Sequence, residues 1–217
     1  MARTVAPSTE AAGESAAALR RGELAILPTD TVYGIAADIS NDDAVRAIYT
    51  AKRRKPDFPL QVLFGRDRAV LNRYAVIAPP AQELVDALGP GGWTIIVPCR
   101  DGWDSPALSG GRTVGFRMVP VEVTLDVLDI LGRPVAASSA NIAGSASPTT
   151  CAEAVFQVGE SCSIAIDDGP TAQGMDSTVI DLSGTIPRIL REGAIDRETV
   201  ARILKLTHIE VLGSVRQ

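Results

Sequence analysis

The sequence predicts an α/β fold in which helices cover most of the surface of a sheet. Of the 217 residues, 46% are hydrophobic, 22% are charged and only 4% are aromatic, a balance typical of α/β proteins built on Ala, Val, Ile and Leu. Many candidate strands are near-continuous apolar runs, which occur where both faces of a strand are covered. Segments with helical periodicity alternate with these runs. We expect one domain spanning residues 1–217, long enough to bury most of its apolar surface.

Apolar runs and helical patterns give the expected elements in order. Strands are expected at 24–27, 60–64, 94–97, 113–118, 135–137, 164–167, 178–182 and 188–190. Helices are expected at 9–20, 42–52, 79–88, 121–131, 150–157 and 196–205. Thr150 is the clearest helix start because Glu153 completes a capping-box spacing, and Asp196 is a good cap for the last helix. Loops rich in Gly, Ser and Pro occupy 89–92, 105–111, 142–149 and 168–176.

Residue composition argues against several classes of active site. Cys99, Cys151 and Cys162 are odd in number and form no C-x-x-C pair, so neither a disulfide framework nor a thiolate metal site is indicated. His208 is the only histidine, which argues against Ser-His-Asp, Cys-His and multi-histidine metal chemistry. The net charge of −5 argues against broad nucleic-acid binding.

The sequence shows neither the pattern of a membrane span nor that of a signal peptide. No apolar stretch reaches the roughly 20 residues of a membrane span. The Ala-rich N-terminal segment is interrupted by Glu10 and Glu14, so it lacks the apolar core of a signal peptide. A cytoplasmic enzyme that does not contact a membrane is the simplest interpretation.

Small hydroxyls and clustered cations make segment 28–64 the most informative part of the chain. Thr29, Asp30 and Thr31 follow the turn at Pro28, where side chains can be presented at a strand end. A helix then carries the run Lys52 to Lys55 at its end, and Pro56 stops it. Once the helix is broken, Lys52 and Arg54 could converge on one anion. The alternative is that these cations complement the helix dipole and stay solvated, as we expect for Arg53 and Lys55.

Five motifs in order resemble the YrdC-like family of threonylcarbamoyl-AMP synthases. They are PTDTVYG followed by K-x-R and PLQVLF, then TVGFRM at 113–118, PVAASSANIAGSASPT at 134–149, DSTVIDL at 176–182 and ILREGAI at 189–195. The resemblance covers about residues 15–205 and implies a twisted mixed sheet with flanking helices around a large concave pocket. It also implies the short, single-domain form of the family.

The resemblance implies a nucleotidyltransferase reaction. L-threonine, bicarbonate and ATP would give threonylcarbamoyl-AMP and pyrophosphate, the first step toward N6-threonylcarbamoyladenosine at tRNA position 37. A downstream threonylcarbamoyl-transferase complex would modify the tRNA, and direct tRNA contact would be weak. Such chemistry needs positioning and charge neutralisation and no imidazole. Mg²⁺ would arrive with ATP and no protein metal site is expected; whether Asp30, Asp176 or Asp181 orders it stays open.

Site residues carry over from the matched motifs. Lys52 and Arg54 would be the catalytic cations, with Lys52 on phosphate. L-threonine would contact Thr29, Arg54, Arg117 and Ser177, and the nucleotide would contact Lys52, Thr113, Ser139, Asn141, Ser147 and Arg191. Thr113 and Arg117 stand four apart on one strand and therefore face the same way.

Three of these positions also have a purely structural interpretation. Thr29 could bond its own turn, Arg117 could pair with a buried carboxylate, and Ser147 lies in a stretch that indicates only a loop. Three residues depart from the family pattern: Leu63 stands where some relatives have histidine, Glu192 replaces a frequent proline, and Trp93 is shifted relative to the Pro-Gly pair.

Two rival functions follow from the same residues. A related carbamoyl-transfer domain would act on carbamoyl phosphate and not on threonine with bicarbonate. An RNA-binding module would show a strongly salt-dependent RNA affinity and release no pyrophosphate. The acidic balance and the hydroxyls at the ends of buried strands favour the enzyme.

Overall fold

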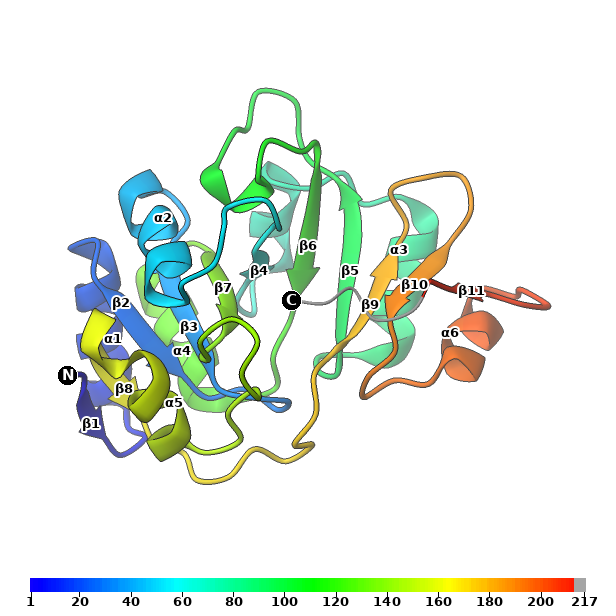
Figure 1. The fold of residues 1–217 in the computed structure, drawn as a ribbon. Helices are drawn as coiled ribbons and strands as arrows, with labels where there is room; N and C mark the ends of the chain where they lie inside the picture. The colour runs from blue at the N-terminus through cyan, green and yellow to red at the C-terminus, as the bar shows by residue number, and fades with distance from the viewer. Residues whose placement is uncertain (213–217) are drawn as a thin grey trace.

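A computed structural model of the chain describes residues 1–212, and one eleven-stranded mixed sheet runs through them (Figure 1). The strand order is β1-β8-β2-β3-β7-β4-β6-β5-β9-β10-β11. The strands are β1 (Arg3–Val5), β2 (Leu24–Leu27), β3 (Gly34–Asp38), β4 (Gln61–Leu63), β5 (Trp93–Pro98), β6 (Thr113–Arg117), β7 (Val135–Ser139), β8 (Cys162–Ile166), β9 (Thr178–Asp181), β10 (Arg188–Arg191) and β11 (Glu210–Val211). The sheet contains both parallel and antiparallel strand pairs, so it is a mixed sheet, as the family resemblance implied.

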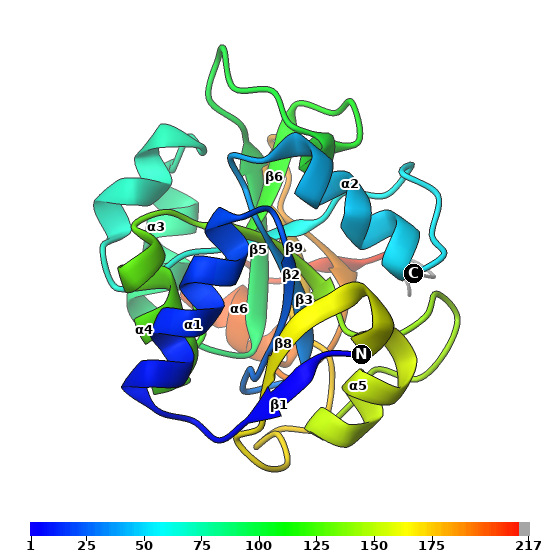
Figure 2. The ribbon, with the colours of Figure 1, turned by 90° about the vertical axis from the view of Figure 1, so that its left-hand side faces the viewer.

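Helices cover both faces of the sheet. They are α1 (Thr9–Arg20), α2 (Asp42–Ala51), α3 (Pro79–Leu88), α4 (Glu122–Leu131), α5 (Cys151–Val158) and α6 (Arg197–Ile203), with short 3₁₀ turns at Arg68–Arg73, Pro106–Leu108 and Gly159–Ser161. Figure 2 shows α1 and α4 on one side of the sheet and α2 and α5 on the other. Each side has its own apolar cluster, because alternate residues of a buried strand point to opposite faces. No helix within residues 1–212 is long and apolar enough to cross a membrane.

All eight predicted strands and all six predicted helices are present, with boundaries within two residues of those expected. The capping box at Thr150 and Glu153 is formed, and the Asp196 side chain caps α6. Three strands were not predicted. β3 consists of Gly34, Ile35, two alanines and Asp38, a composition with little strand propensity, and its pairing with β2 and β7 forms it. β1 and β11 are only three and two residues long, and each pairs with a single neighbour at an edge of the sheet.

The end of α2 is a Schellman turn whose left-handed residue lies between Lys52 and Arg54. The Arg54 N–H donates to the Tyr49 carbonyl at 2.9 Å and the Arg53 N–H to the Thr50 carbonyl at 3.0 Å. Arg53 occupies the left-handed position of this turn, with φ of 52°, where glycine is the usual residue. The chain therefore changes direction between the two cations.

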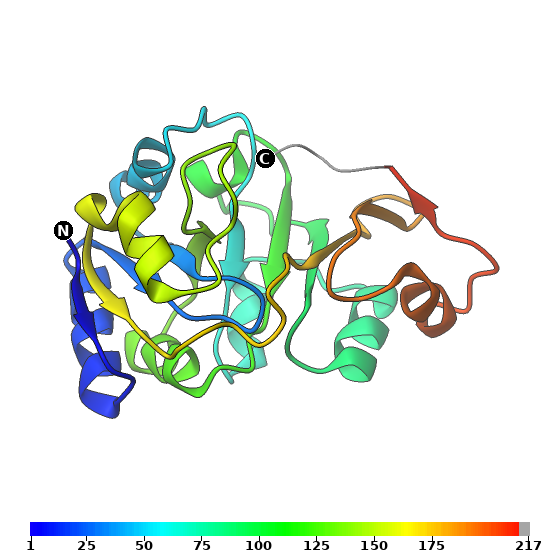
Figure 3. The same ribbon diagram turned by 60° about the horizontal axis from the view of Figure 1, so that its bottom comes forward.

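A long loop brings two polar residues across the molecule. Residues 167–177 connect β8, near one end of the sheet, to β9, and Figure 3 shows this segment crossing the underside. Backbone hydrogen bonds hold it: Thr171 N–H donates to the Thr149 carbonyl and Gln173 N–H to the Asp30 carbonyl, both at 2.9 Å. The Tyr33 hydroxyl donates to the Gly169 carbonyl at 2.7 Å. This loop delivers Asp176 and Ser177 to the middle of the sheet.

Replacing Arg53 by glycine is expected to stabilise the protein. A residue with a Cβ is disfavoured in the left-handed region, and glycine is not, so Arg53→Gly should raise the free energy of unfolding by roughly 0.5 to 1 kcal/mol. Arg53→Ala, which keeps the Cβ, is the matched control and should change it by less than about 0.5 kcal/mol. Urea denaturation measures both. A destabilised glycine variant would contradict the assignment of the turn.

Candidate active site

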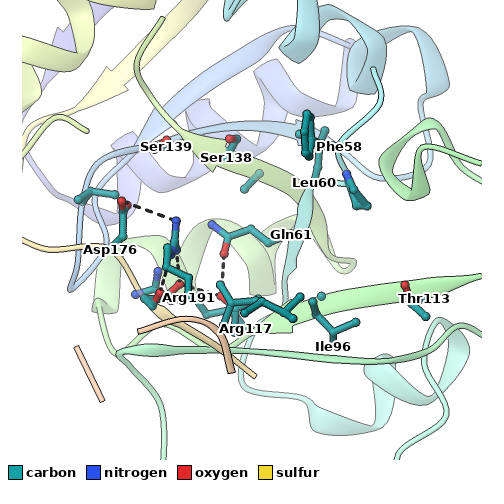
Figure 4. Close-up of a pocket in the computed structure, with 18 of the residues that line it drawn as sticks. Phe58, Leu60, Gln61, Ile96, Thr113, Arg117, Ser138, Ser139, Asp176 and Arg191 are labelled. Carbon is teal, nitrogen blue, oxygen red and sulfur yellow. Dashed lines mark hydrogen bonds and ion pairs between the residues drawn. The ribbon is translucent and has the colours of Figure 1, made fainter. Parts of the chain in front are cut away.

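One cavity of about 210 Å³ lies over the middle of the sheet, on the face opposite α3. The pleat of two strands explains its polar floor: Trp93, Ile95 and Val97 of β5 pack in the apolar core, whereas Thr94 and Ile96 line the cavity. On β6 the alternation is the same, since Val114 and Phe116 are in the core, and Thr113, Gly115 and Arg117 line the cavity. Thr113 and Arg117 thus face the same way, as predicted. In Figure 4, Ser138 and Ser139 border one side of the cavity, with Arg117 and Arg191 across from them.

Lys52 lies behind the cavity wall rather than in it. Its side chain is only 2% exposed. The ammonium donates to the carbonyl oxygens of Ser139 and Asn141 and to the Asn141 Oδ1, the last two at 2.8 and 3.1 Å, with Ser139 Oγ at 3.4 Å. Burial, and after it the charge of Arg54, lowers the pKa of Lys52 to about 7. The lysine thus fixes the turn that follows β7, and its contact with phosphate stays a prediction.

Arg54, unlike Lys52, lines the cavity. Its guanidinium carbon lies 5.3 Å from the centre of the Phe58 ring, a cation–π contact. Burial lowers the pKa of Arg54. Its Nε has no hydrogen-bond partner within residues 1–212. The group is therefore oriented by an aromatic face while keeping donors available for an anion.

Arg117 is held by a buried ion pair. Its Nη2 donates to Asp30 Oδ1 at 2.6 Å, and the side chains are 2% and 5% exposed. The other oxygen of Asp30 accepts the Gly92 N–H at 2.7 Å. Arg117 Nε is buried without a partner in the described part of the chain, although Arg117 lines the cavity. The structural interpretation of Arg117 is therefore confirmed, and the guanidinium keeps one buried N–H, at Nε, without a partner among the described residues.

Residues at the end of the loop 167–177 and on β10 form the opposite wall. Arg191 donates to the Ser177 carbonyl at 3.0 Å and to Ser177 Oγ at 3.2 Å, and its Nη1 lies 3.6 Å from Asp176 Oδ2. Ser147 Oγ donates to Asp176 Oδ1 at 3.2 Å. The backbone at Gly193 packs so closely that a Cβ there would lie 2.2 Å from the Asp176 carbonyl oxygen, which explains the glycine in this motif.

The ten predicted site residues divide into two layers. Six line the cavity: Arg54, Thr113, Arg117, Ser139, Ser177 and Arg191. Three of the others bond to lining residues, since Thr29 Oγ1 donates to the Val32 carbonyl at 2.6 Å, Lys52 bonds Ser139 and Ser147 bonds Asp176. Asn141 accepts from Lys52 and donates to Ile142 and Ser145 carbonyls, which orders its own loop. The hydroxyl of Thr29 thus bonds its own turn, and its contact with a ligand stays a prediction.

Several lining residues were not among the predicted site residues. They are Gln61, Thr94, Ser138 and Asp176, together with the apolar wall. Thr94 carried a usable signal, because a hydroxyl in an otherwise apolar strand must find a polar partner. Gln61 offered no signal, because a lone glutamine in a strand is an ordinary surface residue.

A magnesium ion bound by the protein alone does not fit this cavity. Within residues 1–212 there is no group of three or more His, Cys, Asp or Glu side chains that could hold a metal. Asp176 is the single carboxylate among the described lining residues and is about one-third exposed. One carboxylate beside a polyphosphate is a usual arrangement for Mg²⁺ that arrives with a nucleotide.

The fold and cavity together define a class of protein. This is an α/β protein whose sheet carries a cavity with three arginines, hydroxyls at strand ends and one carboxylate, features suited to binding anionic ligands. The Sua5/YciO/YrdC family model, described as "Telomere recombination", matches residues 17–193. The chain belongs to this family.

Relatives and solved structures agree with this membership. A Mycobacterium tuberculosis protein whose provisional name is threonylcarbamoyl-AMP synthase is 36% identical over 198 residues, which cover 90% of each chain. The threonylcarbamoyl-AMP synthase of Bacillus subtilis is 36% identical over 91% of this chain and 57% of its own length. A crystal structure of Pyrococcus abyssi Sua5 complexed with L-threonine matches with a TM-score of 0.90 and 31% identity, covering 97% of this chain and 62% of that one.

The pKa of Lys52 gives a testable pH dependence of stability. In the unfolded chain a lysine titrates near 10.4, so between about pH 7 and 10 the unfolded state binds more protons and the free energy of unfolding rises with pH. Relative to Lys52→Met, which cannot titrate, the wild type should gain roughly 2 kcal/mol between pH 6 and 8.5. Urea denaturation across this range measures the difference. A constant difference would mean that the surrounding oxygens keep the ammonium protonated throughout.

Proposed function

We propose that this chain is an L-threonylcarbamoyladenylate synthase, a nucleotidyltransferase acting on L-threonine, bicarbonate and ATP. The observation that carries the proposal is the set of three guanidinium groups, Arg54, Arg117 and Arg191, around one cavity. Guanidinium groups suit carboxylates and phosphates, the two kinds of anion that the reactants bring. Curated relatives named threonylcarbamoyl-AMP synthase, and a threonine complex of one related protein, support the assignment.

The proposed reaction requires no covalent enzyme intermediate. The amine of threonine condenses with bicarbonate to a carbamate with loss of water. A carbamate oxygen then attacks the α-phosphorus of ATP, the bond from that phosphorus to the bridging oxygen breaks, and pyrophosphate leaves. Both steps bring anions together, so the chief task of the protein is to position them and offset their charge.

The two walls of the cavity suggest how the reactants divide between them. Arg117, fixed by Asp30, would bind the threonine carboxylate. Arg191 and Ser139 would face the nucleotide, as would Thr113, which lies at the other end of the cavity from Asp176 (Figure 4). Arg54 would reach the carbamate or the phosphates. Mg²⁺ would be held mainly by the phosphates, with Asp176 as its protein ligand.

Four residues behind the wall would act by positioning. Lys52 and Asn141 fix the turn after β7, Ser147 orients Asp176, and Thr29 shapes the turn after β2. Each would also keep the ligand contact that the family resemblance implies, Thr29 with threonine and the other three with the nucleotide, so its loss would both misplace cavity residues and remove that contact. We further propose that the product passes to a separate transferase complex in the cytoplasm, which modifies adenosine 37 of tRNA.

Pyrophosphate release tests this proposal directly. With the purified chain, ATP and Mg²⁺, release should require both L-threonine and bicarbonate, because their carbamate is the nucleophile. Arg54→Ala should lower the rate at least about ten-fold, since a charge-assisted hydrogen bond contributes roughly 1.5 to 3 kcal/mol. Arg53→Ala is the matched control and should have little effect, because an exposed charge contributes at most about 1 kcal/mol.

Two outcomes would favour the rival functions. Turnover that needs carbamoyl phosphate and not threonine would identify a carbamoyl-transfer domain. RNA binding that weakens steeply with salt, without any pyrophosphate release, would identify an RNA-binding module.

A further inference from the structure

We propose that Gln61 recognises the side-chain hydroxyl of the amino-acid substrate, as the last member of a one-way hydrogen-bond chain. This inference rests on the proposed function and adds a specificity residue to it. This hydrogen-bond chain consists of Arg191, Ser177, Thr94 and Gln61. All four line the cavity, and they come from β10, the end of the crossing loop, β5 and β4.

The distances place the four polar groups in continuous contact. Arg191 Nη2 lies 3.2 Å from Ser177 Oγ, and Ser177 Oγ lies 2.9 Å from Thr94 Oγ1. Thr94 Oγ1 donates to Gln61 Oε1 at 3.1 Å. Ser177 and Thr94 are 2% and 5% exposed. Buried hydroxyls at these distances must share their protons in a consistent order.

The number of protons on each group determines which group donates in each of these hydrogen bonds. A guanidinium only donates and an amide oxygen only accepts. Thr94 has one hydroxyl proton, which it donates to Gln61 Oε1. Thr94 must therefore accept from Ser177, which has already accepted from Arg191. Every proton consequently points from Arg191 toward Gln61.

This direction determines what the cavity offers a ligand. Because Gln61 accepts through Oε1, its amide nitrogen keeps two donors, which have no partner within residues 1–212 and face the cavity in Figure 4. The proton of Ser177 is used, so its oxygen retains only an acceptor lone pair. The site therefore presents a donor at Gln61 and an acceptor at Ser177.

A hydroxyl group matches both partners at once. It can accept from the Gln61 amide and donate to Ser177 Oγ, whereas a methyl group leaves both unpaired. Sites built this way reject analogues that lack the hydroxyl much more strongly than analogues that lack a methyl. Gln61 is the glutamine of PLQVLF, and it is not among the site residues that the family resemblance implies.

Substrate selectivity of matched variants tests the proposal. The measurement is kcat/KM for L-threonine, L-serine and L-2-aminobutyrate, from pyrophosphate release at saturating ATP and bicarbonate. Wild type should prefer threonine over 2-aminobutyrate by at least about 100-fold. Gln61→Leu should reduce this ratio ten-fold or more, chiefly through the KM for threonine. Thr94→Val keeps the shape of the side chain but removes the hydroxyl that links Ser177 to Gln61. It should also reduce the preference for threonine over 2-aminobutyrate.

Controls separate this inference from folding defects and from the proposed function. Gln82→Leu changes an exposed glutamine on α3 whose side-chain amide donates to Asp86, and should leave the ratio unchanged. Thermal unfolding and ATP affinity, measured for each variant, identify any that fold poorly, and Gln61→Glu then serves as a second variant that keeps an acceptor but lacks the donors. An unchanged ratio in folded Gln61→Leu overturns the inference.

Direct binding keeps the inference testable if wild type releases no pyrophosphate with threonine, the outcome that overturns the proposed function. Calorimetric affinities of the same three amino acids for wild type and Gln61→Leu would then decide. A preference for hydroxyl-bearing amino acids that Gln61→Leu abolishes supports the role of Gln61. Equal affinities in wild type overturn it.

Discussion

The buried ion pair between Asp30 and Arg117 is the interaction on which the rest of the site depends. Removing two charges from water costs several kcal/mol per ion. The attraction between the ions and their hydrogen bonds offset this cost, so such a pair contributes little net stability. What this pair contributes is geometry. The Asp30 carboxylate joins the turn after β2, strand β6 through Arg117, and the turn before β5 through the Gly92 N–H at 2.7 Å. Three segments distant in sequence are thereby fixed around one guanidinium.

The remaining polar groups extend the same arrangement outward. Lys52 ties α2 to the turn after β7, and Asp176 accepts from Ser147 while lying beside Arg191. Burial lowers the pKa of Arg54, Arg117 and Arg191, because each guanidinium is partly removed from water. Asp30 and Asp176 offset two of the three arginines, which leaves the described cavity with surplus positive charge. An anionic ligand completes this balance, and the donors are oriented before it arrives.

Local signals in the sequence predicted most of the fold. The motifs predicted six of the residues that line the cavity and missed others, among them Gln61 and Thr94. Apolar runs, caps and prolines located the longer elements because those signals act over a few residues. β3 escaped prediction because its pairing between β2 and β7 overrides the weak strand propensity of its alanines. Motif positions identified Arg54 and Arg117, but that Arg54 lines the cavity and Lys52 does not follows from the turn at Arg53, which only the folded backbone shows. Gln61 was missed because its significance depends on Thr94 and Ser177, which only the folded sheet places beside it.

The most direct test of the central claim measures L-threonine and ATP affinity in Asp30→Asn by titration calorimetry. If Asp30 orients Arg117 for the threonine carboxylate, this nearly isosteric change should weaken threonine binding at least about ten-fold, the equivalent of one charge-assisted hydrogen bond. ATP affinity should stay within about two-fold, since the nucleotide is assigned to other residues. Asp181→Asn on β9 is the matched control, because the Asp181 carboxylate accepts from Ser183 and does not line the cavity. Threonine affinity equal to wild type in a folded Asp30→Asn protein would contradict the account.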